Sequence, residues 1–322
     1  MPGNAVIETT RLTKHFCHPF FTWVVRARAL TDLAIRIEPG EVFGLLGPNG
    51  SGKSTALKLI LGLIFPTAGS VSLFGRSPRD FTAKERLGYL PEESYLYRFL
   101  TAEETLDFYG RLFRLTRRER RRRIDTLLSL VGLQAERRRS VVEFSKGMQR
   151  RLVLAQALIN NPELIILDEP TSGLDPIATA QIKNLIQELR AEGKTIVLSS
   201  HLLANVEDVC DRVTILYGGR QQVTGSVEEL TRHAHLKQIT AQVGDDTLTA
   251  VEALIHEREG RKTKIDVTVP TENLESFFLR TVKDAQEHNL TTSGANDTSV
   301  GDLGFLRQET VPKDGEGKAK TS

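Results

Sequence analysis

The sequence predicts an α/β domain built on a parallel sheet, and three features lead to this prediction. From Ala29 onward, short runs typical of strands alternate with longer runs of helical periodicity. The runs LIIL and TIVLSS have strand length and are largely apolar, as in parallel strands covered on both faces. A glycine-rich segment, GPNGSGKST, lies between an apolar strand and a helical run, which is typical of the ligand-binding edge of such sheets.

The first strands of this domain are predicted on either side of residue 40. In LTDLAIRI, the apolar residues Leu33, Ile35 and Ile37 alternate with other residues, which indicates one half-buried strand. EVFGLL follows as a more uniformly apolar strand and leads into the glycine-rich segment.

Helix starts are marked by N-capping patterns. Three pairs have the spacing of a capping box, in which each side chain accepts from the other residue's backbone N–H: Thr101 with Glu104, Thr116 with Glu119, and Ser226 with Glu229. Asp175 followed by Pro176 predicts an N-cap and a first helical residue, opening a helix that runs to about residue 191. Gly218 and Gly219 predict a hairpin turn between two later strands.

The glycine-rich segment predicts a phosphate-binding loop, because a strand precedes it and a helix follows it. Its candidate nucleotide-binding residues are Gly47, Pro48, Asn49, Gly50, Ser51, Gly52, Lys53, Ser54 and Thr55. The glycines let successive N–H groups point at phosphate oxygens, and the helix N-terminus adds positive partial charge. The Lys53 side chain is predicted to reach the β- and γ-phosphates, and the Ser54 hydroxyl to ligate Mg²⁺. A plain turn with an incidental lysine is not favoured in this context.

Two acids, Asp168 and Glu169, follow the predicted strand LIIL, where ligands bind in open α/β sheets. One carboxylate there is suited to hold the metal through water, and the next to polarise an attacking water. Two solvated acids at a strand end would be the simpler interpretation of an isolated pair. The phosphate-binding loop favours the catalytic one.

Three further motifs resemble the ABC ATPase family. Residues 145–149, SKGMQ, are similar to the family signature LSGGQ; TSGLD at 171–175 is similar to its D-loop; and His201 matches its switch histidine. The resemblance extends over about residues 6–230. It implies a P-loop NTPase core with a parallel sheet, an antiparallel β subdomain and a helical subdomain over about residues 92–160. We therefore expect an ABC ATPase domain at 1–235, a small α+β appendage at 236–288 and a disordered tail at 289–322.

The resemblance also implies how ATP and Mg²⁺ are used. Two domains would pack head to tail, so that the signature of one covers the ATP held by Lys53 of the other. Glu169 would act as the general base, and His201 would bind the γ-phosphate. The residues implied to contact the nucleotide from signature and D-loop are Ser145, Gly147, Gln149 and Asp175, and those implied to bind Mg²⁺ are Ser54, Asp168 and Glu92.

Three positions depart from the usual family pattern. Glu92 in GYLPEE stands where a glutamine is usual, and its carboxylate is an acceptable Mg²⁺ ligand. Lys146 replaces a signature glycine and faces either the phosphates or solvent. Phe16 is the candidate for stacking on adenine, with competitors in the following aromatic-rich insertion: Phe20, Phe21 and Trp23.

GYLPEE, FSKGM and the LT-x-x-E at 100–104 together look most like the ATPase subunits of type-2 ABC exporters. This implies a second, identical or related ATPase subunit, a separate multi-span permease, and a cytoplasmic position on the inner face of the plasma membrane. The longest apolar run, at 57–65, is shorter than the about 20 residues that a spanning helix needs. Residues 1–10 lack the pattern of a secretory signal.

Other functions are less well supported. A net charge of +2 does not point to nucleic acid, and we expect no direct nucleic-acid contact. Soluble ABC ATPases acting on ribosomes resemble two fused cassettes, and those acting on DNA carry a long coiled coil, which the segment between Lys53 and Ser145 is too short to hold. TKID at 263–266 mimics a guanine-reading motif by chance.

The arginine-rich runs at 117–123 and 137–139 contact anionic lipid or an acidic partner, or form solvated helix faces. Cys17 and Cys210 are expected to be reduced thiols.

Overall fold

The computed structural model describes residues 5–17, 25–93, 95–231 and 244–259. The chain divides into two compact units between Leu230 and Thr231. The first holds the described residues up to Leu230, and the second holds the helix α9 (Asp245–Glu259). No helix among these described ranges is long and apolar enough to cross a membrane.

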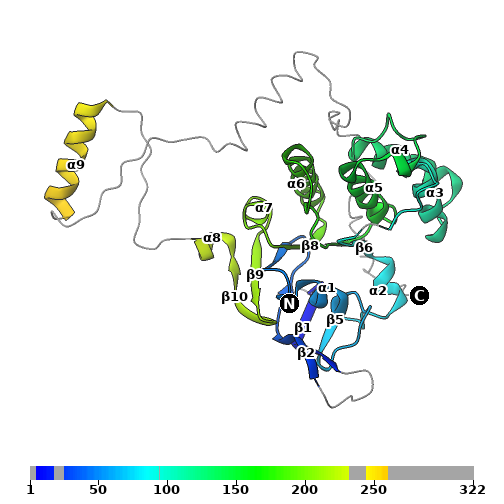
Figure 1. Cartoon of the computed structure of the whole chain (residues 1–322), viewed down its shortest axis with the longest axis horizontal. Helices are drawn as coiled ribbons and strands as arrows, with labels where there is room; N and C mark the ends of the chain where they lie inside the picture. The colour runs from blue at the N-terminus through cyan, green and yellow to red at the C-terminus, as the bar shows by residue number, and fades with distance from the viewer. Residues whose placement is uncertain (1–4, 18–24, 94, 232–243, 260–322) are drawn as a thin grey trace, which may run out of the picture. The chain divides into compact units, whose positions relative to one another are not determined.

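The first unit is organised around one continuous sheet (Figure 1). Its strand order is β3-β1-β2-β10-β9-β4-β8-β7-β6, with β5 paired to β1. The strands are β1 (Ile7–Cys17), β2 (Val25–Leu33), β3 (Arg36–Ile37), β4 (Val42–Leu46), β5 (Ala68–Leu73), β6 (Leu87–Leu90), β7 (Leu164–Leu167), β8 (Thr195–Ser200), β9 (Arg212–Tyr217) and β10 (Arg220–Ser226).

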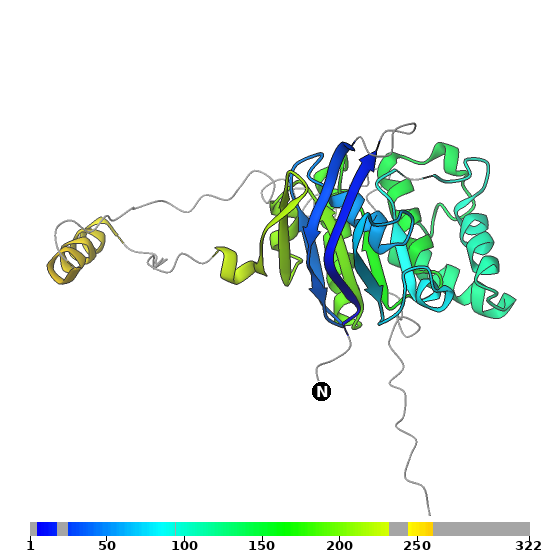
Figure 2. The ribbon, with the colours of Figure 1, turned by 90° about the horizontal axis from the view of Figure 1, so that it is seen from below.

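The sheet has a parallel half and an antiparallel half. Strands β9, β4, β8, β7 and β6 pair in parallel, whereas β1 pairs antiparallel with β2, β3 and β5. Figure 2 shows the antiparallel strands side by side across one face of this unit. The parallel sheet and the antiparallel β subdomain expected from the sequence are therefore both present.

Helices cover both faces of the parallel strands. They are α1 (Lys53–Ile60), α2 (Phe81–Glu85), α3 (Ala102–Leu112), α4 (Arg117–Leu130), α5 (Lys146–Leu158), α6 (Pro176–Ala191), α7 (Ala204–Glu207) and α8 (Val227–Thr231), with a 3₁₀ turn at Val141–Glu143. One buried cluster joins Ile165 and Leu167 of β7 to α3, α4, α5 and α6. A second joins Leu164 and Ile166 of the same strand to α1 and the antiparallel strands. Burial on both faces explains why β7 reads as a continuous apolar run.

The predicted strand LTDLAIRI is interrupted, which corrects the sequence-based expectation of one element. β2 ends at Leu33 and β3 begins at Arg36. Between them the Thr9 hydroxyl donates to the Leu33 carbonyl (3.1 Å) and accepts from the Ile35 N–H (2.9 Å), so a side chain bridges the ends of the two strands. Leu33, Ile35 and Ile37 are nevertheless all buried, as their alternation predicts.

The capping predictions are confirmed at most positions. Thr101 and Glu104 form a complete capping box, and so do Ser226 and Glu229. Asp175 caps α6 with Pro176 in its first turn, and Gly218 and Gly219 form the hairpin turn with φ of 57° and 73°.

The capping box predicted at the start of α4 is half wrong. Thr116 accepts from the Glu119 N–H (3.3 Å), but the Glu119 carboxylate accepts from Arg123 (2.5 Å) instead of reaching back to Thr116. The arginine-rich run thus has partners within its own subdomain, since Arg120 also pairs with Asp107 (2.6 Å). Arg120 and Arg123 are thus paired and largely buried, whereas the other arginines of the run are exposed: Arg117, Arg118, Arg121 and Arg122.

The region beyond residue 231 is described only at 244–259. The helix α9 was not predicted from the sequence. Most of the α+β appendage expected at 236–288 and the whole tail expected at 289–322 lie outside the described residues. The domain boundaries remain predictions.

Candidate active site

The loop at residues 47–55 joins the carboxyl end of β4 to the start of α1. Gly52 is the N-cap of α1, with φ of 104°, and a Cβ there would lie 2.5 Å from the Ala29 carbonyl oxygen of β2. A Cβ on Gly47 would lie 2.2 Å from the Leu216 carbonyl oxygen. Glycine is therefore required at both positions by conformation and by space. No side chain caps α1, so its first-turn N–H groups are presented as an anion-binding edge.

The Lys53 ammonium lies inside this loop. Nζ donates to the carbonyl oxygens of Gly47 (2.7 Å) and Pro48 (3.3 Å). It also lies 3.3 Å from Oε1 of Glu169, and both side chains are less than a tenth exposed. A buried cation is costly unless it is paired, and here it is paired with the second of the two acids that follow β7. The structure thus brings the loop and the second acid into contact.

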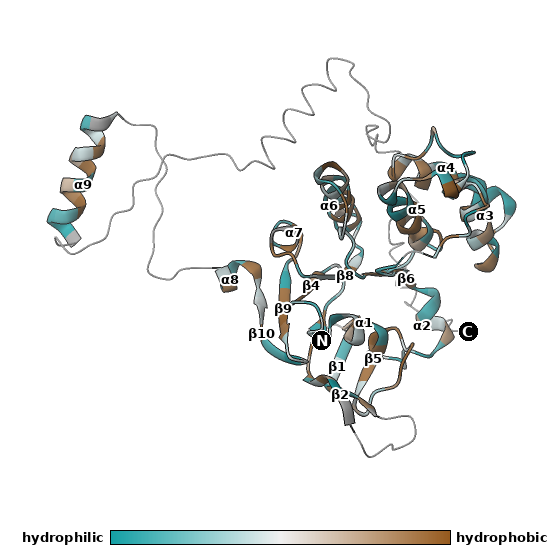
Figure 3. Cartoon of the chain, in the orientation of Figure 1, coloured by the Kyte–Doolittle hydropathy of each residue, from teal (hydrophilic) through white to brown (hydrophobic). Residues whose placement is uncertain are grey.

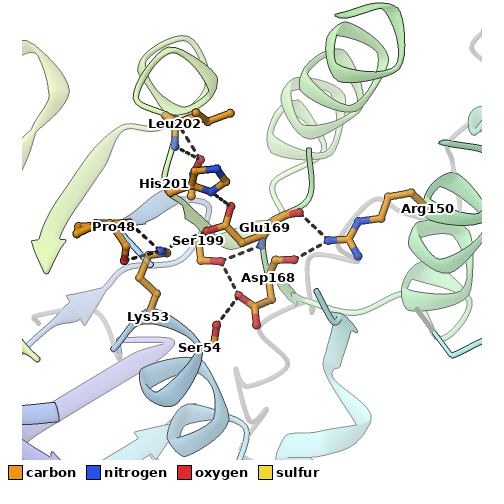
Figure 4. Close-up of polar contacts among 11 residues, drawn as sticks. Pro48, Lys53, Ser54, Arg150, Asp168, Glu169, Ser199, His201 and Leu202 are labelled. Atoms are coloured by element: carbon orange, nitrogen blue, oxygen red, sulfur yellow. Dashed lines mark hydrogen bonds and ion pairs between the residues drawn. The ribbon is translucent and has the colours of Figure 1, made fainter. Parts of the chain in front are cut away.

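The first acid, Asp168, is held by two hydroxyls (Figure 4). Its Oδ1 accepts from Ser54 (3.3 Å) and from Ser199 of the neighbouring strand β8 (2.6 Å). The Ser199 hydroxyl also accepts from the backbone N–H of Glu169 (2.8 Å), so it fixes both acids at once. Sequence reasoning missed Ser199. The available signal was its position at the carboxyl end of TIVLSS, two residues before His201.

The second acid, Glu169, lies between two basic side chains. His201 Nδ1 is 2.8 Å from Oε2, opposite the Lys53 contact with Oε1. Glu169 also has φ of 48°, in the left-handed region, which for a residue other than glycine costs on the order of 1–3 kcal/mol and persists only where the surroundings enforce it. Such strain is concentrated at functional sites. Here it directs the carboxylate towards the loop.

Another residue that sequence reasoning missed is Arg150. It lies on α5, is buried, and donates to the backbone carbonyls of Asp168 (2.5 Å) and Glu169 (2.8 Å). In the sequence it is one of many arginines. Nothing in its local pattern distinguishes it from solvated ones.

The signature residues surround the start of α5. Ser145 is exposed and is the N-cap of this helix, accepting from the Met148 N–H (3.2 Å). Lys146 turns towards Gly173 of the segment 171–175, where a Cβ would lie 2.2 Å from the lysine Nζ. Lys146, for which the phosphates and solvent were the two predicted directions, is exposed and lies beside the D-loop of its own chain. Asp175 caps α6 through the Ala178 N–H (2.8 Å).

Three candidate ligands stand apart from the Lys53–Glu169 cluster. Gln149 donates to the Phe144 carbonyl (3.1 Å) and lines a cavity of about 590 Å³ together with Tyr97, with none of the loop residues 47–55 in its lining. The Glu92 side chain is exposed, and it is the Glu92 carbonyl that bonds to Arg150 (2.8 Å). Within the described ranges no contact joins the Glu92 carboxylate to Ser54 or Asp168. The third candidate, Phe16, lies on β1.

Phe16 pairs with Ala27 of β2, the strand that passes the loop at Ala29. Its ring is partly exposed, with Lys14 Nζ 5.2 Å from the ring centroid. Phe20, Phe21 and Trp23 lie outside the described residues. Phe16 thus lies on the strand beside the one that lines the loop.

The residues present fit a nucleotide and a hard metal ion. The buried Ser51 hydroxyl, at the centre of the loop, has no hydrogen-bond partner among the described residues. Carboxylate and hydroxyl oxygens of the Asp168, Ser54 and Ser199 cluster are the ligand type that Mg²⁺ prefers.

Comparison with known proteins identifies the family. A model of the family described as ABC transporter matches residues 30–172. An uncharacterized ABC transporter ATP-binding protein of Synechocystis sp. is 37% identical over 312 residues, covering 89% of this chain and 87% of the relative. The Nod factor export ATP-binding protein I of Sinorhizobium fredii is 42% identical over 248 residues, covering 76% of this chain and 68% of the relative.

A solved structure supports the same family assignment. An ATP-binding cassette captured as a dimer in a post-hydrolysis state, with ADP and Pi bound, is similar to this chain with a TM-score of 0.62 and 27% identity, covering 69% of this chain and 98% of the other. The ABC ATPase fold expected from the motifs is thereby confirmed. The chain belongs to the family of ABC transporter ATP-binding proteins, and it is an ATPase that binds nucleotide and hydrolyses ATP as a subunit of a transporter.

Proposed function

We propose that two copies of this chain close head to tail around two Mg·ATP and drive export through a separate multi-span permease at the inner face of the plasma membrane. The observation that carries the proposal is the Lys53–Glu169–His201 cluster at the mouth of the loop. The similarity to a Nod factor export ATP-binding protein supports the outward direction.

Each residue of the cluster has a role in this proposal. The ammonium of Lys53 binds the β- and γ-phosphates, which releases the Oε1 atom of Glu169 from its ion pair. The Glu169 carboxylate then takes the proton of the attacking water as general base. His201, bonded to the other carboxylate oxygen, holds the base in place and faces the γ-phosphate. Ser54 and Asp168 would hold Mg²⁺, which would neutralise part of the phosphate charge.

The second copy completes the site from the other side. Ser145 is exposed at the N-terminus of α5, where a hydroxyl and helix N–H groups are suited to contact a phosphate. We infer that it contacts the γ-phosphate held by the Lys53 loop of the partner copy, with Gly147 beside it. Closure excludes bulk water and strengthens these contacts.

An exposed aromatic surface supports the permease as the other partner. Tyr95 and Phe99 are 80% and 79% exposed, and Tyr97 lies with its ring centroid 5.9 Å from that of Phe99 and 5.6 Å from that of Phe108. Phe108 lies on α3 and is 38% exposed, and Figure 3 shows that this helix carries hydrophobic as well as hydrophilic residues. Exposed aromatic patches of this kind mark protein interfaces. We assign this surface to a cytoplasmic segment of the permease.

The test uses a tagged Glu169→Gln variant with ATP in its native cell. Loss of the base traps the closed dimer, so the variant is expected to elute as a dimer and to retain a multi-span membrane protein. Adding Tyr97→Ala and Phe99→Ala is the control: the dimer should persist and the membrane protein should be lost. Recovery of ribosomes or DNA-associated proteins alone would overturn the transporter assignment and leave a non-transport ABC ATPase.

A further inference from the structure

We infer that Arg150 is a positioning residue for ATP hydrolysis: it fixes the backbone of the base Glu169 and ties the signature helix α5 to it. This role goes beyond the proposed export function, because it concerns hydrolysis alone and holds whatever the permease or cargo.

The Arg150 guanidinium donates to carbonyls of two separate segments. At the carboxyl end of β7 it bonds to Asp168 (2.5 Å), Glu169 (2.8 Å) and Pro170 (3.2 Å). Beyond the end of β6 it bonds to Glu92 (2.8 Å) and to Pro91. All three of its nitrogens take part. Figure 4 shows the guanidinium on the backbone side of the two acids, away from the loop that holds Lys53.

These contacts enclose the strained residue of the site. Glu169 has φ of 48°, and Arg150 holds the carbonyl before it, its own carbonyl and the carbonyl after it. Ser199 holds its N–H (2.8 Å). The peptide groups on both sides of Glu169 are therefore fixed, which is the condition for a left-handed backbone to persist. The direction of the carboxylate towards Lys53 and His201 follows from that backbone.

An arginine suits this position better than a lysine. A guanidinium offers five N–H donors in a rigid planar fork, whereas an ammonium offers three from one atom. Arg150 is 5% exposed, and burial lowers its pKa to about 10, opposed by the charges of Asp168 and Glu92. It therefore stays charged at neutral pH, with its charge behind the two acids.

The same side chain connects the acids to the partner copy's nucleotide. Arg150 lies on α5, and Ser145 is the N-cap of that helix. One helix therefore carries both the residue proposed to contact the partner's ATP and the guanidinium that bonds to the carbonyls of Asp168 and Glu169.

The adjacent residue Arg151 is a matched control. It lies on the same helix and is 4% exposed, but it donates to the Val131 carbonyl (3.0 Å) in the helical subdomain. Burial lowers its pKa as well. Replacing Arg151 disturbs a second buried guanidinium of α5, one that bonds to the helical subdomain, so it measures the structural effect of losing such a group from this helix.

The experiment compares ATP hydrolysis by the full chain carrying Arg150→Lys or Arg151→Lys, below the unfolding temperature of both. We expect kcat of Arg150→Lys to fall about tenfold or more, because a small misplacement of a catalytic group costs up to about 100-fold, while KM for ATP changes less than about threefold. Arg151→Lys should keep kcat within about twofold of the wild type, since its guanidinium bonds to the Val131 carbonyl of the helical subdomain.

A second variant, Arg150→Gln, keeps two N–H donors without a buried charge and should show the same loss of kcat. If Arg150→Lys does not fold, Arg150→Gln tests the positioning role in its place. Equal kcat values for the Arg150 and Arg151 variants, at equal loss of thermal stability, would overturn the inference and leave Arg150 as a structural residue. A rise in KM with kcat unchanged would also overturn it.

Discussion

His201 Nδ1 lies 2.8 Å from the Oε2 atom of Glu169, and this contact holds the proposed base from the side opposite Lys53. The histidine side chain is 34% exposed whereas that of Glu169 is 7% exposed, so His201 is the partly exposed member of the pair and Glu169 the buried one. Because His201 follows β8 and Glu169 follows β7, two adjacent parallel strands bring them together.

His201→Ala should reduce kcat for ATP hydrolysis by on the order of 100-fold, because the base loses an orienting partner and the phosphate loses a donor. Binding of ATP, measured by equilibrium titration with Glu169→Gln as the common background, should change much less. His201→Gln, which keeps a donor, serves as the control and should retain more activity than His201→Ala. Equal activity of the two would argue against an orienting role.

Ser199→Ala should weaken catalysis, because its hydroxyl bonds both to the Asp168 carboxylate and to the Glu169 N–H. The Mg²⁺ concentration for half-maximal activity is expected to rise about tenfold, as for other residues that orient a metal ligand. The control is Ser200→Ala, whose hydroxyl bonds only to Leu202 among the described residues. A Mg²⁺ titration in which both variants behave alike would contradict this prediction.

Gly52→Ala should destabilise the chain and abolish ATP binding. A left-handed φ costs a non-glycine residue about 1–2 kcal/mol, and the added Cβ would also meet the Ala29 carbonyl. Gly50→Ala is the control, since Gly50 has φ of 78° but nothing within 4 Å of its Cβ position. Urea unfolding should give a clearly lower midpoint for Gly52→Ala than for Gly50→Ala. The prediction fails if the two midpoints agree.

We predict that Lys194 makes the free energy of unfolding rise with pH in the alkaline range. It is 1% exposed and donates to Asn161 Oδ1 (2.6 Å), and burial lowers its pKa from 10.5 to about 8. Between these two values the unfolded chain binds a proton that the folded chain does not, so stability rises with pH. The free energy of unfolding should rise by about 1 kcal/mol or more over this pH range, after allowance for solvent screening.

The measurement for Lys194 is the urea midpoint of the wild type and of Lys194→Met as a function of pH. The difference between the two proteins isolates this residue from all other titrating groups. It should grow in favour of the wild type as pH rises above about 8. A difference that stays constant with pH would show that Lys194 does not change its protonation in this range.

Motifs that form within one stretch of chain could be predicted well. The loop around Lys53, the N-caps at Thr101 and Asp175 and the turn at Gly218 each depend on a few consecutive residues. Their local geometry follows from propensity and hydrogen bonding within the segment. The acids could be predicted as well, because the end of a buried parallel strand has a known place in such a sheet.

The contacts that complete the site could not be predicted in this way. Arg150 resembles many solvated arginines in sequence, and the position of the Lys146 side chain beside Gly173 was neither of the two predicted directions. The capping box at Thr116 failed for the same reason, since Arg123 competes for the Glu119 carboxylate.

By itself the sequence determined the family and the parallel core, and it predicted the residues that hold phosphate, because these are encoded in contiguous patterns. Only the tertiary structure decided that Arg150 and Ser199 hold the backbone of Glu169. Such contacts join α5, β7 and β8, which are separate in the chain. Their formation depends on how closely these elements pack, and no local pattern of residues carries that information.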